Sequence, residues 1–182
     1  AGMPRAVAEA MQSLAYNSIA CILVALERAE HPDLSWVYLP HDDQGPANRV
    51  TYMSNYSPEN APAGKSSFLC EVTHRGGTSA PGSELEQQVI AGLVQAGLMR
   101  PDEVLFTDRS GARHAYVVFD HLYGARRQAA LDWLAEQGLL TLGRFGRFEY
   151  DNSDQCVIKA RTLAAELLVE ARRGAPAPRA RS

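Results

Sequence analysis

The hydrophobic pattern of the first 75 residues predicts one helix followed by four strands. Residues 4–14 place Val7, Ala10, Met11 and Leu14 at helical spacing. The continuous apolar run "NSIACILVALE" (17–27) is typical of a strand covered on both faces. Turn-rich segments then separate three short β-prone runs, the pattern of an antiparallel meander. These runs are "LSWVYLP" (34–40), "NRVTYMSNYS" (48–57) and "KSSFLCEVTH" (65–74).

The second half of the chain predicts three helices and further strands. Ser83 and Glu86 form a capping-box pattern at the start of an apolar helical repeat, which Pro101 is expected to stop. "EVLFTD" (103–108) and "HAYVVFD" (114–120) flank a short polar connection and predict a hairpin. A helix over 125–138 ends at Gly138, a strand covers 139–150, and a long docked helix begins after Asn152.

These elements lack regular βαβ alternation and therefore predict an α+β fold. We expect a single domain with a mainly antiparallel or mixed sheet and about four helices. A chain of 182 residues can bury about 70% of its unfolded surface, enough for one substantial core. Residues 1–173 form the folded portion in this interpretation. The proline-, alanine- and arginine-rich end, 174–182, is expected to be disordered.

Charge and cysteine usage narrow the function classes. The net charge is −3 and basic residues concentrate only in the tail, so we expect no nucleic-acid partner. Cys21, Cys70 and Cys156 lack the spacing of a zinc site or a disulfide framework, and we expect no metal. The most apolar run is about half the length of a membrane span, so we expect no membrane partner and a cytoplasmic protein.

The stretch "GRFGRFEYDNSDQC" (143–156) carries the candidate chemistry. Asn152 can cap the last helix, and Gln155 can complete a capping box. The free amides and dipole of that helix start suit an oxygen that gains negative charge, as the pyrimidine edge of a flavin does on reduction. On a strand, Arg144 beside Gly143 would suit a cofactor's phosphates or sugar. Alternatively, Asn152 is an ordinary cap and Arg144 a surface salt-bridge partner.

"GRFGRFEYDNSDQCVIKA" (143–160) resembles the C-terminal flavin-contacting motif of UDP-galactopyranose mutase and of protoporphyrinogen oxidase or amine oxidase-like flavoproteins. "NRVTYMSNYSPENAP" resembles that family's arginine-bearing sheet segment, and "HAYVVFD" its tyrosine-led segment. The resemblance covers roughly residues 4–170. It implies that Arg49 and Tyr116 face a small substrate and that five residues contact FAD. These are Gly143, Arg144, Asn152, Ser153 and Asp154.

The sequence also departs from this family. In the mutase the residues matching Asn152 and Ser153 are an aspartate and a methionine, which favours the oxidase-like relatives here. Neither "GxGxxG" nor "GxxxxGK" occurs, so the N-terminal dinucleotide-binding half is unmatched. We therefore expect a fragment of an FAD-dependent oxidoreductase, with a longer chain or a partner chain supplying that half. The isolated chain should be inactive and bind FAD weakly or not at all.

Two alternatives stay open. The chain could be a stand-alone, non-catalytic ligand-binding or interaction module, in which case the face that the missing half would cover should be polar. An exposed apolar face would instead favour a missing half and possible homodimerisation.

Arg49, among several aromatic residues, requires an anion, either Glu71 or an acidic group of a substrate. The sequence indicates no catalytic residue.

Overall fold

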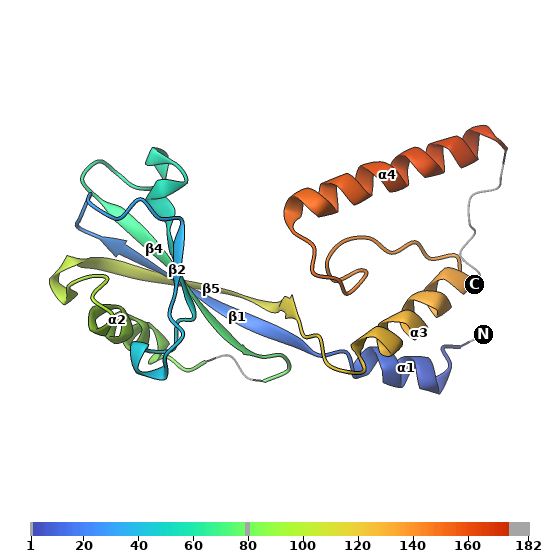
Figure 1. The fold of residues 1–182 in the computed structure, drawn as a ribbon, viewed down its shortest axis with the longest axis horizontal. Coiled ribbons are helices and arrows are strands. Elements are labelled where there is room, and N and C mark those ends of the chain that lie inside the picture. Colours follow the sequence, from blue (N-terminus) through green and yellow to red (C-terminus); the bar gives the residue numbers. More distant parts are fainter. Residues whose placement is uncertain (1, 79–80, 175–182) are drawn as a thin grey trace. The chain divides into compact units, whose positions relative to one another are not determined.

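The computed structural model describes residues 2–78 and 81–174. It confirms the predicted α+β class, with four α-helices and a five-stranded antiparallel sheet (Figure 1). The helices are α1 (Arg5–Gln12), α2 (Leu85–Gln95), α3 (Tyr123–Glu136) and α4 (Ser153–Arg172). The strands are β1 (Tyr16–Leu26), β2 (Trp36–Tyr38), β3 (Arg49–Tyr52), β4 (Ser66–Arg75) and β5 (Val104–Val117).

The predicted single domain consists of two compact units. The sheet unit is Asn17–Ala115, and the helical unit combines Ala1–Tyr16 with Tyr116–Ser182. Strands β1 and β5 each extend by one or two residues past the boundary between the units. The expected disordered tail, 174–182, lies outside the described residues except for Gly174.

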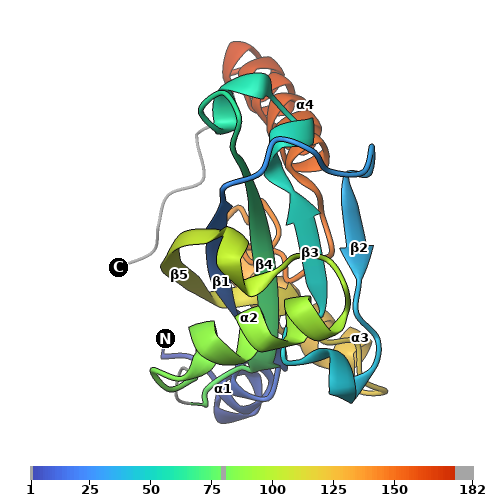
Figure 2. The ribbon, with the colours of Figure 1, turned by 90° about the vertical axis from the view of Figure 1, so that its left-hand side faces the viewer.

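The sheet unit has its core on one face of the sheet. The strand order is β2-β3-β4-β1-β5, which confirms the predicted meander of β2, β3 and β4. Alternate β1 residues Ile22, Val24 and Leu26 are fully buried. Helix α2 lies across this face of the sheet (Figure 2) and contributes Leu85, Val89 and Leu93 to the same core. The amphipathic pattern of α2 therefore covers one face of the sheet and leaves the other open.

The predicted hairpin at 103–120 is wrong, because β5 runs without interruption from Val104 to Val117. Gly111 does not form a turn. A Cβ atom at Gly111 would lie 2.8 Å from the carbonyl oxygen of Ile19 in β1. The glycine is therefore needed where the backbones of two strands approach closely, a signal that resembles a turn in the sequence.

Both predicted ends of α2 differ from the structure. The N-cap residue is Glu84 rather than Ser83, and no side chain caps the helix. At the other end, Gly97 has a φ of +70°, in the left-handed region that ends helices. The helix therefore stops before Pro101 is reached. Gly138, with a φ of +72°, ends α3 in the same way and as predicted.

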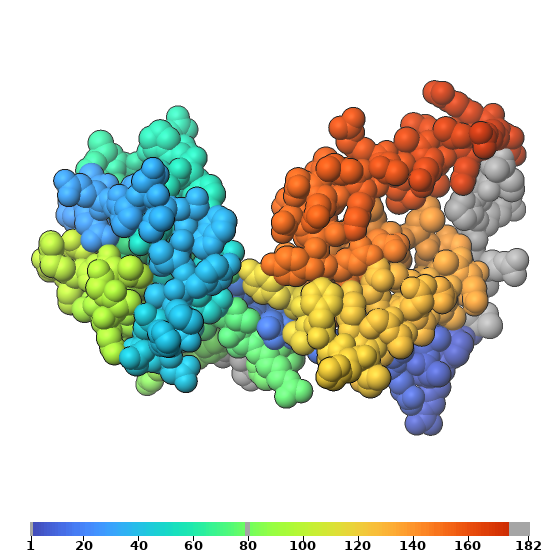
Figure 3. Space-filling model, in the orientation of Figure 1, coloured from blue at the N-terminus to red at the C-terminus, as the bar shows by residue number. Residues whose placement is uncertain are grey.

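Helix α4 is long, as predicted, but the expected docking is wrong. No residue of α4 is buried within the described chain. Cys156, Ala160, Leu163 and Leu167 are only half-buried. Figure 3 shows α4, in orange to red, at the surface of the helical unit. Other apolar residues of the helix are exposed to solvent: Val157, Ile158, Leu168 and Val169.

We predict that Gly92→Ala destabilises the protein although alanine favours helices. A Cβ atom at position 92 would lie 2.3 Å from the carbonyl oxygen of Gln44 and 2.9 Å from the Cα of Gly45. Relief of this clash should cost about 1–3 kcal/mol in the free energy of unfolding. Urea unfolding followed by the fluorescence of Trp36 and Trp133 measures the change.

Gly124→Ala is the matched control, because it also lies in a helix but has no atom within 4 Å of its Cβ position. It should stabilise by up to about 1 kcal/mol. A Gly92→Ala protein as stable as the parent would contradict the close packing of α2 against residues 44–45.

Candidate functional site

The segment between α3 and α4 is a compact turn, so the strand predicted for 139–150 is wrong. The Arg147 N–H donates to the Gly143 carbonyl at 2.9 Å, and the Glu149 N–H donates to the Arg144 carbonyl at 2.8 Å. These bonds span four and five residues, as in a helical turn rather than a strand. Arg144 and Arg147 therefore do not alternate on the two faces of a strand.

Two glycines allow this turn. Gly143 has a φ of +82°. A Cβ atom at Gly146 would lie 2.1 Å from the carbonyl oxygen of Leu142. Both glycines therefore allow the backbone to fold back on itself, and this folding sets the position of Arg144.

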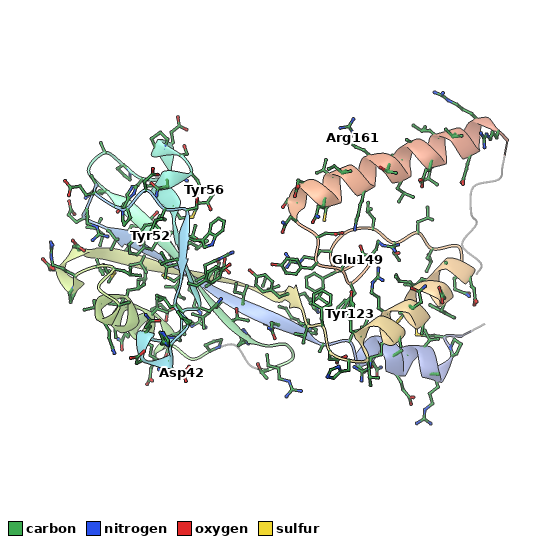
Figure 4. All side chains as sticks on the ribbon, viewed as in Figure 1. Asp42, Tyr52, Tyr56, Tyr123, Glu149 and Arg161 are labelled. Carbon is green, nitrogen blue, oxygen red and sulfur yellow. The ribbon has the colours of Figure 1, made fainter. Side chains whose placement is uncertain are left out.

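An ionic network anchors the turn to the helices on both sides. Glu149 pairs with Arg127 of α3 and accepts a bond from Lys159 Nζ of α4 at 2.6 Å. Lys159 also donates to both carboxylate oxygens of Asp151 at 2.8 Å, and Asp151 is only 7% exposed. The Tyr123 hydroxyl donates to the carbonyl of Phe148. Tyr123 lies at the start of α3 and Glu149 in the turn between α3 and α4, whereas Arg161 of α4 points away from the turn (Figure 4).

Arg144 lies against two tyrosine rings. Its guanidinium carbon is 5.0 Å from the ring centre of Tyr116 and 4.4 Å from that of Tyr150. The two rings stack, with centres 6.2 Å apart and planes 18° from parallel. Both contacts are within the range of cation–π attraction. The turn thus brings together Arg144, Tyr116 and Tyr150, which we call the Arg144 cluster.

Part of the Arg144 guanidinium is buried without hydrogen-bond partners. Nε and Nη2 are inaccessible to solvent and donate to no atom of the described chain. No carboxylate of the described residues pairs with Arg144, which argues against the surface salt bridge considered above. Unpaired donors on a buried cation are costly. An acceptor-bearing ligand at this point would remove that cost.

Helix α4 begins as predicted. Asn152 is the N-cap residue, and its N–H donates to Gln155 Oε1 at 2.8 Å. Ser153 and Asp154, which follow, are exposed. The residues of the first turn of α4 are therefore exposed to solvent, at the positive end of the helix dipole.

Arg49 lies on the open face of the sheet and pairs with Glu71 of β4. Glu71 is thus the anion that Arg49 contacts, of the two considered from the sequence. The Trp36 ring centre is 6.0 Å from the Arg49 guanidinium carbon. Burial, and then the charge of Glu71, raises the pKa of Cys21 above its ordinary value, while Arg49 lowers it. Arg49 and Tyr116, the two substrate-side candidates, lie in different compact units.

The aromatic residues of the meander do not share one surface. Tyr52 is buried in the core, edge-on to Phe68 at 5.1 Å between ring centres. Trp36, Tyr38 and Tyr56 are exposed. Tyr150 is a site residue to which the sequence assigned no role. The available signal was its proximity to Arg144 in the chain, which becomes contact only through the turn.

Within residues 2–78 and 81–174, no group of three or more His, Cys, Asp or Glu side chains is placed to hold a metal ion. In the same part of the chain, no helix is long and apolar enough to cross a membrane.

Comparison with known proteins reveals relatives by fold. No family model and no curated protein matches the sequence. A crystal structure of reduced UDP-galactopyranose mutase matches with a TM-score of 0.72 and 24% identity, covering 78% of this chain and 31% of the other. A candidate protoporphyrinogen oxidase from Exiguobacterium sp. matches with a TM-score of 0.61 and 15% identity, covering 88% and 36%. The chain shares their fold and spans about a third of each.

We predict that the charges on the open face control the reactivity of Cys21. Glu71→Gln removes a charge that raises the thiol pKa, so more thiolate forms at a given pH and alkylation accelerates. Arg49→Met removes the opposing charge and should slow alkylation. Iodoacetamide labelling across pH 7–10, read by peptide mass spectrometry, measures both rates.

Glu27→Gln is the control, because Glu27 pairs with Lys65 at 2.7 Å and does not affect the Cys21 pKa. Cys70 should stay unlabelled, since burial raises its pKa to about 12. If the Glu71 and Arg49 variants changed the alkylation rate of Cys21 in the same direction, the assigned causes of its pKa would be contradicted.

Proposed function

We propose that this chain is the substrate-side and C-terminal cofactor-contacting portion of an FAD-dependent oxidoreductase. The observation that carries the proposal is the Arg144 guanidinium, whose buried Nε and Nη2 lack partners. The names of both structural relatives support a redox role, since one is a reduced mutase and the other a candidate oxidase. In this proposal FAD supplies the electron-transfer chemistry, and the chain binds and orients the cofactor and a small substrate.

The described residues fit FAD at two points. Arg144 has buried, unpaired N–H donors of the kind that pair with a phosphate oxygen or a sugar hydroxyl. The Tyr116 and Tyr150 rings hold the guanidinium in place, so little side-chain entropy is lost on binding. The backbone at Gly143 fixes the turn. At the start of α4, the amides after Asn152, near Ser153 and Asp154, suit the pyrimidine edge of the isoalloxazine.

The remainder of the cofactor site must come from elsewhere. The sequence has no glycine-rich phosphate loop, and the two relatives are about three times longer than the matched region. The exposed apolar residues of α4, including Val157 and Ile158, favour a surface that another part of the enzyme covers. A stand-alone module would be expected to carry polar residues there. We therefore propose a missing half, in the same chain or a partner chain, rather than an autonomous module.

Arg49 and Tyr116 are the proposed substrate-side residues. Arg49 is neutralised by Glu71, so it presents a hydrogen-bonding ion pair rather than a free positive charge. Tyr116 takes part in the Arg144 cluster and would link substrate and cofactor only in the assembled enzyme.

We predict weak, saturable FAD binding to the isolated chain, centred on Arg144 and the start of α4. Titration of ¹⁵N-labelled protein with FAD into the millimolar range should shift the Arg144 Nε–H signal and the amides of residues 153–155. Arg144→Met should weaken binding about 10-fold, because charge-assisted bonds to a phosphate are lost.

Arg161→Met is the matched control, since Arg161 lies exposed on the same unit and points away from the turn. It should leave the shifts unchanged. Shifts elsewhere on the protein, or identical binding by the Arg144→Met protein, would overturn the assignment. A stoichiometric complex at micromolar FAD would contradict the proposal that most of the cofactor site lies outside this chain.

A further inference from the structure

Helix α4 carries a second stripe of residues on the side opposite the one that faces its own unit. Its half-buried side is marked by four residues spaced three or four positions apart: Cys156, Ala160, Leu163 and Leu167. The opposite side carries a set of exposed residues, which we call the outer stripe: Asp154, Ile158, Arg161, Ala165, Leu168 and Arg172. Ile158 and Leu168 are 61% and 60% exposed, and Arg161 points outward (Figure 4). The outer stripe is therefore uncovered within the described residues.

The outer stripe has the spacing of a coiled-coil seam. Its residues follow one another at intervals of four, three, four, three and four positions, as the a and d positions of a heptad repeat do. A hollow of about 310 Å³ on this side is lined by Ile158, Arg161, Thr162 and Ala165. In coiled-coil packing, four residues at the spacing i, i+3, i+4 and i+7 form the hole that receives a side chain of the facing helix. The exposed side of α4 is therefore suited to pack against another helix.

The outer stripe is complementary to itself when two copies of α4 run antiparallel. In one register, three kinds of pair form between the copies, each twice by symmetry: Ile158 with Leu168, Arg161 with Ala165, and Asp154 with Arg172. The apolar side chains then meet, and the small Ala165 leaves room for the stem of Arg161. Opposite charges meet at both ends of the helix pair. In a parallel pair, Asp154 would instead face Asp154 and Arg172 would face Arg172, which is unfavourable.

We propose that α4 binds α4 of a second copy of this chain through the outer stripe and forms an antiparallel homodimer. Within residues 2–78 and 81–174, Asp154, Arg161 and Arg172 take part in no ion pair, so their charges are available to the second copy. A single helix pair buries less than the roughly 1,600 Å² of a standard interface, so the association is reversible, with a dissociation constant of about 10–100 µM.

The dimer goes beyond the flavin proposal and can fail without it. In the assembled enzyme the missing half would cover the same side of α4, so the dimer and the assembled enzyme are alternative states of this helix. Asp154 belongs both to the outer stripe and to the proposed flavin contacts, so dimerisation would withhold it from the cofactor. The dimer is measured without FAD, whereas the flavin contact is tested at Arg144, outside the outer stripe. A monomeric chain would therefore overturn the dimer alone.

Sedimentation equilibrium of the full chain without FAD tests the dimer. Over concentrations of about 5–500 µM the mean mass should rise from that of the monomer, 19.9 kDa, towards twice that value. A reductant is present throughout, because Cys21, Cys70 and Cys156 are free thiols that would otherwise cross-link copies. A protein that stays monomeric at about 500 µM overturns the proposal, and this is the result expected if only the missing half covers α4.

Substitutions of exposed residues locate the interface. Leu168→Asp should weaken the association at least about 10-fold, because it buries a carboxylate opposite Ile158 of the second copy. Leu34→Asp is the matched control, since Leu34 is 48% exposed but lies in the sheet unit, and this protein should dimerise as the parent does. If circular dichroism shows that Leu168→Asp does not fold, Ile158→Asp replaces it and introduces the charge from the other side of the same pair. A folded variant of this kind that associates as tightly as the parent overturns the proposal.

Charge reversal at the two ends of the outer stripe tests the antiparallel register. Asp154→Arg and Arg172→Asp should each weaken the association about 2- to 5-fold, because like charges then meet at both ends. An equal mixture of the two variant proteins should regain the parent's affinity, since each mixed dimer again pairs opposite charges. In a parallel dimer either substitution would only replace one like-charge pair by another. Single variants that associate as the parent does, or a mixture no tighter than its components, would therefore overturn the register.

Discussion

The carboxylate of Glu149 anchors the turn between α3 and α4, which carries the Arg144 cluster. It joins Arg127 of α3 to Lys159 of α4, and Lys159 in turn neutralises the buried Asp151. Breaking such a partly buried network leaves several charges without partners, so its members act as one set. The turn from Gly143 to Tyr150 can therefore keep one conformation although it contains no regular secondary structure.

That fixed turn explains how Arg144 can stay unpaired. Its flat guanidinium contacts two tyrosine faces, which compensate part of the desolvation but accept no conventional hydrogen bond. Ser66 in the sheet unit shows the same imbalance for a neutral group. Proteins commonly accept a loss of stability where a binding site must keep donors and acceptors free for a ligand. Arg144 is the position to which the flavin proposal traces.

The sequence predicted the elements better than the local geometry that creates sites. The continuous apolar run of β1 and the period of α2 were predicted correctly as a strand and a helix. The expectation that β1 is covered on both faces was wrong, because α2 covers one face of the sheet and Cys21 and Leu23 on the other are only half-buried. Two glycines gave wrong predictions of secondary structure, because a glycine where two strands approach closely and a glycine in a turn look alike in sequence. Gly111 belongs to the first kind and Gly146 to the second. From the sequence, the partner of Arg49 could be one of two anions, and the structure shows Glu71. The contact between Tyr150 and Arg144 depends on the turn at 143–150, and no local sequence pattern predicts that turn.

The division of the chain into units sets the order in which its parts can fold during synthesis. The sheet unit is contiguous, from Asn17 to Ala115, and can fold as soon as that stretch has left the ribosome. The helical unit is assembled from both ends of the chain. Ser13 accepts a bond from Arg126, 113 residues later, so α1 must wait for α3 to emerge. During translation the N-terminal helix is therefore left without its native neighbour, and its apolar side is exposed to chaperones throughout that interval.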